Sequence, residues 1–219
     1  MTGIIGVLGA SGGTGSVIVR QLLDADQHVR AAVRSADAAR RLEAAGADVV
    51  RLDLTSSSNA ELVAAFTGLD AIINAAAASS VTGIGARRVD RDGVGRAVAA
   101  AEQAGVPRWI QLSMMGADNP KVVPLFLRRV ASVKGQADAN VTRSGLRWTV
   151  IRPPWLTDGP PSGRVVLARN LTGGSITRGD VAGIAIACLD EPATERQAFD
   201  IASGTTPVRE ALAAAAQLT

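Results

Sequence analysis

The stretch that decides the fold is IIGVLGASGGTGSVIV, residues 4–19. It begins as an apolar run typical of a buried strand. A loop with glycines at 9, 12 and 15 follows, and then a helical pattern starts at Ser16. Glycines let this backbone turn tightly, approach a pyrophosphate closely and pack the helix against the sheet, while the N–H groups at the helix start attract phosphate oxygens. Because the glycines follow a strand and open a helix, we predict a dinucleotide-binding loop; the alternative is a purely structural loop. The predicted contact residues are Gly9, Ser11, Gly12, Gly13, Thr14 and Gly15.

Short apolar runs alternate with amphipathic stretches along the first two thirds of the chain. This alternation implies right-handed crossovers and a mainly parallel sheet. The fold class we predict is therefore α/β, a Rossmann-like doubly wound sheet. Expected strands cover residues 4–8, 29–33, 48–52, 70–74, 108–112 and 148–151, and expected helices include 36–45, 60–66, 85–104 and 124–144.

The pattern changes after Arg152, where prolines and glycines mark irregular chain. We expect an extended run at 164–167, a helix at 180–189 capped by Asp180, a strand at 198–201 and a helix at 207–216 with proline in its first turn. This segment is too short for a separate domain. Residues 1–219 are predicted to form a single domain, with a cofactor-binding core at 1–152 and a small substrate-closing lobe at 153–219.

Composition limits the classes of partner. The 219 residues are 47% hydrophobic, enough for a full core, and the formal net charge is +3. The arginines are scattered, so we expect no nucleic-acid partner, and no apolar stretch approaches the length of a membrane span, so we expect no membrane partner. No cluster of His, Cys, Asp and Glu has metal-ligand spacing, so no metal site is predicted. The expected partner is a small-molecule substrate, and the oligomeric state is left open.

Two further features favour a cytoplasmic location. The single cysteine, Cys188, cannot form a disulfide within one chain and is expected to be a buried apolar residue. The N-terminus is strand-like and lacks the basic start of a secretory signal.

Arg34 and Ser35 follow the second expected strand, at the place where an NAD site usually carries an acid. Arg34 lies 19 positions after Gly15, close to the usual offset. A guanidinium can pair with a 2′-phosphate and stack on adenine, and Ser35 can add a hydroxyl donor. We therefore predict NADP(H) as the cofactor, the alternative being that Arg34 is a solvated surface residue. Asp37 weakens this prediction slightly.

The third and fourth expected strands also end in candidate cofactor contacts. Asp53 can accept a hydrogen bond from the adenine amino group, although it can instead cap a helix near residues 56–59. Leu54 can cover the adenine ring. The small side chains of Ala75 and Ala76 let the adenosine lie against the backbone.

The chain contains no tyrosine. The Tyr-x-x-x-Lys pair of many short-chain dehydrogenases is therefore absent, and any proton must come from another group or from solvent. His28, the only histidine, is expected at the start of the second strand, far from the strand ends that would form the site.

Several motifs together resemble the atypical short-chain dehydrogenases of the NmrA-like, NAD(P)H-binding type, the group that includes the biliverdin reductase B-like flavin reductases. The resemblance covers nearly the whole chain. It is carried by residues 9–15, 33–34, Asp53, Ser113, and by the stretches 134–138, 144–153, 175–182 and 199–201.

The resemblance implies several site residues. Ser113 corresponds to a position near the nicotinamide and substrate, and Lys134 occupies the family lysine, with Val130 where tyrosine stands in better-known dehydrogenases. Both are our catalytic candidates, and both can also contact the cofactor. Pro153, Trp155 and Leu156 lie in a loop similar to the one that borders the nicotinamide.

An apolar wall for the substrate is expected from Met114, Met115, Phe126 and Trp155, although Phe126 is at least as easily a core residue. Asp158 and Asp180 are expected to act as caps. Arg178 is expected to hold the C-terminal lobe in place through an ion pair rather than to touch substrate.

The leading hypothesis is an NADPH-dependent oxidoreductase that passes hydride to a flat conjugated or carbonyl acceptor, such as a flavin, quinone, tetrapyrrole or ketone, without a catalytic tyrosine. One alternative is a non-catalytic NADP(H)-sensing protein of the NmrA type. Another is an epimerase, isomerase or ketoreductase that acts on a specialised metabolite.

Overall fold

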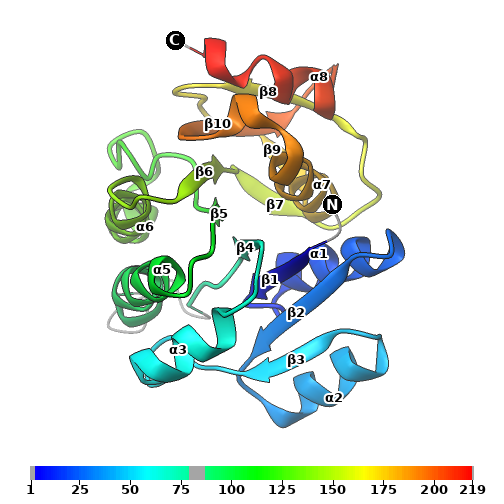
Figure 1. Cartoon of the computed structure of the whole chain (residues 1–219). Helices are drawn as coiled ribbons and strands as arrows, with labels where there is room; N and C mark the ends of the chain where they lie inside the picture. Colours follow the sequence, from blue (N-terminus) through cyan, green and yellow to red (C-terminus); the bar gives the residue numbers. More distant parts are fainter. Residues whose placement is uncertain (1–2, 79–86, 219) are drawn as a thin grey trace.

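The computed structural model describes residues 3–78 and 87–218. Nine strands of this described part form one sheet in the order β11-β8-β10-β6-β5-β4-β1-β2-β3 (Figure 1). Seven of them run parallel to one another, which confirms the predicted mainly parallel α/β fold. These seven are β1 (Ile4–Leu8), β2 (His28–Val33), β3 (Asp48–Arg51), β4 (Ala71–Asn74), β5 (Arg108–Leu112), β6 (Arg147–Arg152) and β10 (Gln197–Ser203).

Helices cover both faces of the sheet (Figure 1). One face carries α1 (Gly13–Asp24), α2 (Ala36–Ala44) and α7 (Arg178–Ala187). The opposite face carries α3 (Asn59–Phe66), α5 (Val94–Gln103) and α6 (Arg128–Thr142). The short helix α8 (Val208–Ala213) packs beside α7.

The apolar run of β1 explains its central place in the sheet. Ile5 and Val7 are buried in the core under α1, whereas Leu8 is buried in the core on the opposite face. A strand covered on both faces needs apolar residues in both directions, which is why it reads as a continuous apolar run rather than an alternating one.

The segment after Arg152 joins the same sheet. The strand β8 (Arg164–Ala168) pairs antiparallel with β10, and β11 (Thr206–Pro207) pairs antiparallel with β8. A second sheet of two parallel strands, β7 (Trp155–Thr157) and β9 (Ser175–Thr177), was not predicted. Strands from both sides of residue 152 pair with one another, as β10 does with β6. The division into a core at 1–152 and a lobe at 153–219 stays a prediction.

Several expected helices differ from the structure. The expected helix at 85–104 begins, in its described part, as a π-helix, η1 (Arg87–Gly93), and only then becomes α5; residues 85–86 lie outside the described residues. The expected helix at 124–144 begins with a short 3₁₀ turn, Leu125–Leu127, before α6. The last helix begins after Pro207, which is its N-cap residue and not part of its first turn.

The prediction that Asp180 caps the helix at 180–189 is wrong. The hydroxyl of Thr177 accepts the hydrogen bond from the Asp180 N–H, so α7 begins at Arg178. The buried Asp180 carboxylate instead accepts hydrogen bonds from the backbone N–H groups of Ser162 and Gly163. It therefore fastens the proline-rich loop to α7. None of the described helices is both long and apolar enough to cross a bilayer.

Candidate cofactor-binding site

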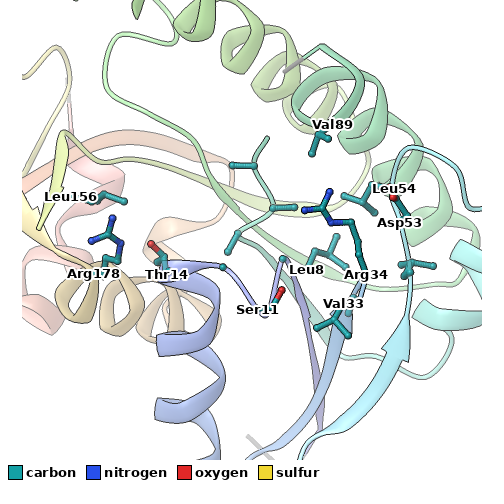
Figure 2. A pocket seen from close by; sticks show the side chains of 18 residues that line it. Leu8, Ser11, Thr14, Val33, Arg34, Asp53, Leu54, Val89, Leu156 and Arg178 are labelled. Carbon is teal, nitrogen blue, oxygen red and sulfur yellow. The ribbon is translucent and has the colours of Figure 1, made fainter. Parts of the chain in front are cut away.

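A cavity of about 440 Å³ opens at the carboxyl ends of β1, β2, β3 and β4. Open α/β sheets bind their ligands at this edge, where the strand order reverses. The glycine loop forms its floor (Figure 2). The lining residues are Leu8, Gly9, Ser11, Gly12, Gly13, Thr14, Ala32, Val33, Arg34, Leu52, Asp53, Leu54, Ala75, Ala76, Ala77, Val89, Leu156 and Arg178.

The N-terminus of α1 faces this cavity without a side-chain cap. Gly12 is the N-cap residue, no side chain accepts from the first turn, and that turn contains no acid. The first N–H groups of a helix have no partner inside the helix, and they carry the positive end of its dipole. The backbone here can therefore hold the phosphates of a dinucleotide.

The glycines of the loop are required for different structural reasons. Gly9 has a φ of 71°, and a Cβ on it would lie 2.6 Å from the Ala76 Cα. Gly15 is buried below the loop, where a Cβ would lie 2.1 Å from the Gly9 carbonyl oxygen. Gly12 lines the cavity, and a Cβ there would meet the same oxygen at 3.2 Å. Gly15, predicted as a cofactor contact, therefore lets the helix pack closely and does not line the cavity.

The other end of the cavity is formed by Arg34, Asp53 and Leu54 (Figure 2). A hydrogen bond from the Thr55 N–H, aided by the Thr55 hydroxyl and the nearby Arg34 charge, lowers the pKa of Asp53 and keeps it ionised. Asp53 does not cap the following helix, because Ser58 and Glu61 form the capping box of α3. The Ser35 side chain caps α2 and lies outside the cavity lining.

The two catalytic candidates lie in a buried polar cluster beside the cavity rather than in its lining. The Lys134 ammonium pairs with the Asp90 carboxylate at 2.7 Å, and both side chains are buried. Asp90 also accepts from the Ala78 N–H, just after β4. Its neighbour Val89 lines the cavity, so the π-helix η1 connects the Lys134 pair to the cavity wall.

Ser113 continues from β5, where its N–H donates to the Ile151 carbonyl at 2.8 Å. Its hydroxyl is buried and makes no hydrogen bond of good geometry within the described residues. The Ser113 hydroxyl lies close to the Asp138 carboxyl. Burial raises the pKa of Asp138, and the Arg152 charge, the Ser113 hydroxyl and Lys134 act in the opposite direction. The Arg152 Nε donates to Asp138 at 3.1 Å.

The protein family of this chain is known from its similarity to other proteins. A family model described as NAD(P)H-binding matches residues 9–192. The chain belongs to this family. The match begins at the glycine loop and includes every strand that borders the cavity except β1.

Three individual proteins are similar to this family member over nearly its whole length. A Bacillus subtilis protein named uncharacterized sugar epimerase YhfK is 40% identical over 94% of this chain and 97% of its own. The NAD(P)H azoreductase of Xenophilus azovorans is 28% identical over 96% of this chain and 73% of its own. A structure described as a putative NAD-dependent epimerase/dehydratase from Bacillus halodurans has a TM-score of 0.88 and 27% identity, and covers 96% of this chain and 98% of its own.

The remaining predicted residues of this NAD(P)H-binding protein lie outside the cavity lining. Pro153 is buried, and its carbonyl accepts from the Met115 N–H at 2.8 Å. Met115 is buried and Met114 partly so. Phe126 is exposed at 71%, so the alternative that it is a core residue is wrong, and Trp155 is exposed at 60%. Their part in substrate binding stays a prediction.

Sequence reasoning missed Arg178, which lines the cavity beside Thr14 (Figure 2). The expected ion pair is present, since the Arg178 Nη1 lies 2.7 Å from the Asp158 Oδ1. The wall residue Val89 was also missed. Arg178 lies far along the chain from the glycine loop, and only the packing of α7 against α1 brings the two together.

Proposed function

We propose that this protein is an NADPH-dependent reductase that delivers hydride to a flat conjugated or carbonyl acceptor, such as a flavin, quinone, tetrapyrrole or ketone. The observation that carries the cofactor preference is Arg34, which lines the cavity at the tip of β2 where an NAD site usually holds a carboxylate. Asp37, the acid nearest to it in sequence, pairs with Arg40. The Arg34 guanidinium can therefore serve a 2′-phosphate.

NADPH, when bound, supplies the hydride. Ser113 and Lys134 are the residues we propose to orient cofactor and acceptor. The buried pair with Asp90 holds the Lys134 ammonium in place, and the Ser113 hydroxyl can donate to or accept from the acceptor. Because the chain has no tyrosine, we propose that the proton comes from solvent, which suits acceptors that become basic once reduced.

The loop after β6 is proposed to lie beside the nicotinamide and the acceptor. Pro153, Trp155 and Leu156 would border the nicotinamide, with Met114, Met115, Phe126 and Trp155 forming an apolar wall for a flat acceptor. The azoreductase relative supports reduction as the reaction class. The names of the other two relatives support a second candidate, an epimerase that oxidises and re-reduces its substrate with a retained cofactor.

The cofactor assignment is tested by replacing Arg34 with alanine and measuring dissociation constants for NADPH and NADH. A guanidinium–phosphate contact corresponds to a loss of about 10- to 100-fold in NADPH affinity. NADH binding should weaken much less, because NADH lacks the 2′-phosphate and loses only the stacking of the guanidinium on adenine. Arg41→Ala, an exposed arginine in the helix that follows, is the matched control and should change neither. Equal losses for both cofactors in Arg34→Ala would contradict the assignment.

The reaction class is tested with the wild-type protein. NADPH absorbance is followed with FMN, FAD, quinones, biliverdin, azo dyes and simple ketones, and nucleotide sugars are analysed separately for epimerised product. Steady oxidation with a flat acceptor supports the reductase. Epimerised sugar without net NADPH loss supports the second candidate. Tight NADPH binding with neither reaction favours the NmrA-type sensor, which needs no group in contact with substrate.

A further inference from the structure

Arg178 reaches the glycine loop from the far end of the chain. It is the first residue of α7, which packs against α1. A Cβ placed on Gly13 would lie 2.9 Å from the Arg178 Nε and 3.4 Å from its Cδ. The guanidinium therefore lies directly over the first residue of α1, and Figure 2 shows it beside Thr14. Glycine at position 13 leaves the space that the arginine occupies.

The cavity lining carries a basic side chain at each of its two ends. Among the described lining residues, Arg34 and Arg178 are the basic ones and Asp53 is the acidic one. Arg34 and Arg178 lie at opposite ends of the cavity, with the glycine loop between them (Figure 2). A helix N-terminus contributes only about half an elementary charge, whereas a dinucleotide pyrophosphate carries two negative charges. The Arg178 guanidinium supplies a full charge at the end where α1 begins.

The ion pair with Asp158 leaves most of the guanidinium available. Arg178 donates from Nη1 to Asp158, and no second hydrogen bond of its side chain is found in the described part of the chain. An arginine has five N–H donors in a planar fork suited to phosphate. The Asp158 side chain is 91% exposed, and the Arg178 side chain 29%. A pair this exposed is weak and does not hold the guanidinium away from a stronger anion.

We propose that Arg178 is a pyrophosphate-binding residue of the dinucleotide site. It joins the C-terminal part of the chain to the cofactor and divides the work with Arg34. Arg34 reads the 2′-phosphate that distinguishes NADPH from NADH, and Arg178 holds the diphosphate that both share. This inference rests on the proposed function, because it requires a nicotinamide dinucleotide in the cavity.

The division of work predicts opposite patterns for the two arginines. Dissociation constants are measured for NADPH, NADH and adenosine 2′-monophosphate, which has no pyrophosphate. Arg178→Met should weaken NADPH and NADH equally, by about 10- to 100-fold, and leave adenosine 2′-monophosphate within about twofold. Arg34→Ala should weaken NADPH and adenosine 2′-monophosphate strongly and NADH much less. Unchanged NADPH and NADH affinities in Arg178→Met would overturn the proposal while leaving the proposed function intact.

Asp158→Asn separates phosphate binding from a structural tether. If Arg178 acts only by tethering the loop through Asp158, this variant should lose as much NADPH affinity as Arg178→Met. We expect NADPH affinity to stay the same or rise by up to about threefold, because a negative charge near the diphosphate is removed. An equal loss in the two variants, or a loss of adenosine 2′-monophosphate binding in Arg178→Met, overturns the proposal.

Arg178→Lys covers the case in which the methionine variant does not fold. It keeps the charge but loses the fork, so NADPH and NADH should weaken equally by about 3- to 10-fold. Unchanged affinities in this folded variant would count against the proposal. A wild-type protein that binds neither dinucleotide would overturn both this inference and the proposed function.

Discussion

Replacing Gly15 with alanine should destabilise the protein even though Gly15 does not line the cavity. A Cβ on Gly15 would lie 2.1 Å from the Gly9 carbonyl oxygen and 3.2 Å from the Ala10 Cα. These are backbone atoms, so relief requires α1 to move away from the loop. Such overpacking typically costs about 1–3 kcal/mol. In a domain of this size, each kcal/mol corresponds to roughly 2–4 °C in Tm, so we expect Tm to fall by about 2–12 °C.

The matched control is Gly183→Ala in α7. Its Cβ would have Gln21 Oε1 at 3.9 Å as its nearest atom, so the added methyl group meets no obstacle. Alanine in a helix then gains about 0.4–1 kcal/mol, because glycine loses more backbone entropy on folding. The Tm of Gly183→Ala should therefore rise. The difference between the two variants isolates the clash from the helix-propensity gain that both share.

Gly12→Ala extends the comparison to the cavity. Gly12 has a φ of −75°, which alanine adopts freely, and its Cβ would lie 3.2 Å from the Gly9 carbonyl oxygen. We expect its thermal unfolding without ligand to stay close to that of wild type, while the added methyl group enters the cavity and reduces the Tm increase produced by NADPH. The reasoning would be refuted by a Gly15→Ala protein as stable as wild type, or by equal losses of Tm in Gly12→Ala and Gly15→Ala.

Two further predictions concern buried titratable groups. Burial raises the pKa of Asp200 from its ordinary 3.8 to about 6, against a hydrogen bond from the Leu171 N–H. The folded protein then holds a proton that the unfolded chain has released, so this group makes stability fall as the pH rises from about 4 to about 6. The urea midpoint of Asp200→Asn, compared with wild type across this range, should lack that part of the decline; parallel pH profiles would contradict the assignment. Burial also raises the pKa of Cys188 to about 12, and the residue is fully buried. At about pH 8 a thiol reagent should therefore leave the native protein unmodified and label it fully in guanidinium chloride, and rapid labelling of the native protein would show that the thiol is accessible.

Local pattern was enough for the elements that are continuous in sequence and strongly apolar. The strand, glycine loop and helix of residues 4–24 are recognisable because glycine is required where the backbone turns under a helix N-terminus. Arg34 and Asp53 were found from the rule that side chains after parallel strands meet at one edge of the sheet. In contrast, β7 and β9 are three residues long and pair only with each other. Strands this short show no hydrophobic periodicity from which they could be predicted. The cap of α7 was misplaced because Thr177 and Asp180 are both good capping residues, and only tertiary hydrogen bonds to the loop at 162–163 assign Asp180 elsewhere.

The sequence by itself determined the α/β class, the parallel sheet and the dinucleotide loop, because each has a local signature: the alternation of short apolar runs with amphipathic stretches, and the glycine spacing after the first strand. Only the tertiary structure decided that Arg178 lies over Gly13, and that Lys134 is paired with Asp90 in a buried cluster beside the cavity. These contacts join segments separated by 44 residues or more, and they form only when α7 packs on α1 and α6 packs beside η1. A local pattern cannot encode such contacts, because side-chain chemistry sets what a residue can do while the packing of distant elements sets what it meets.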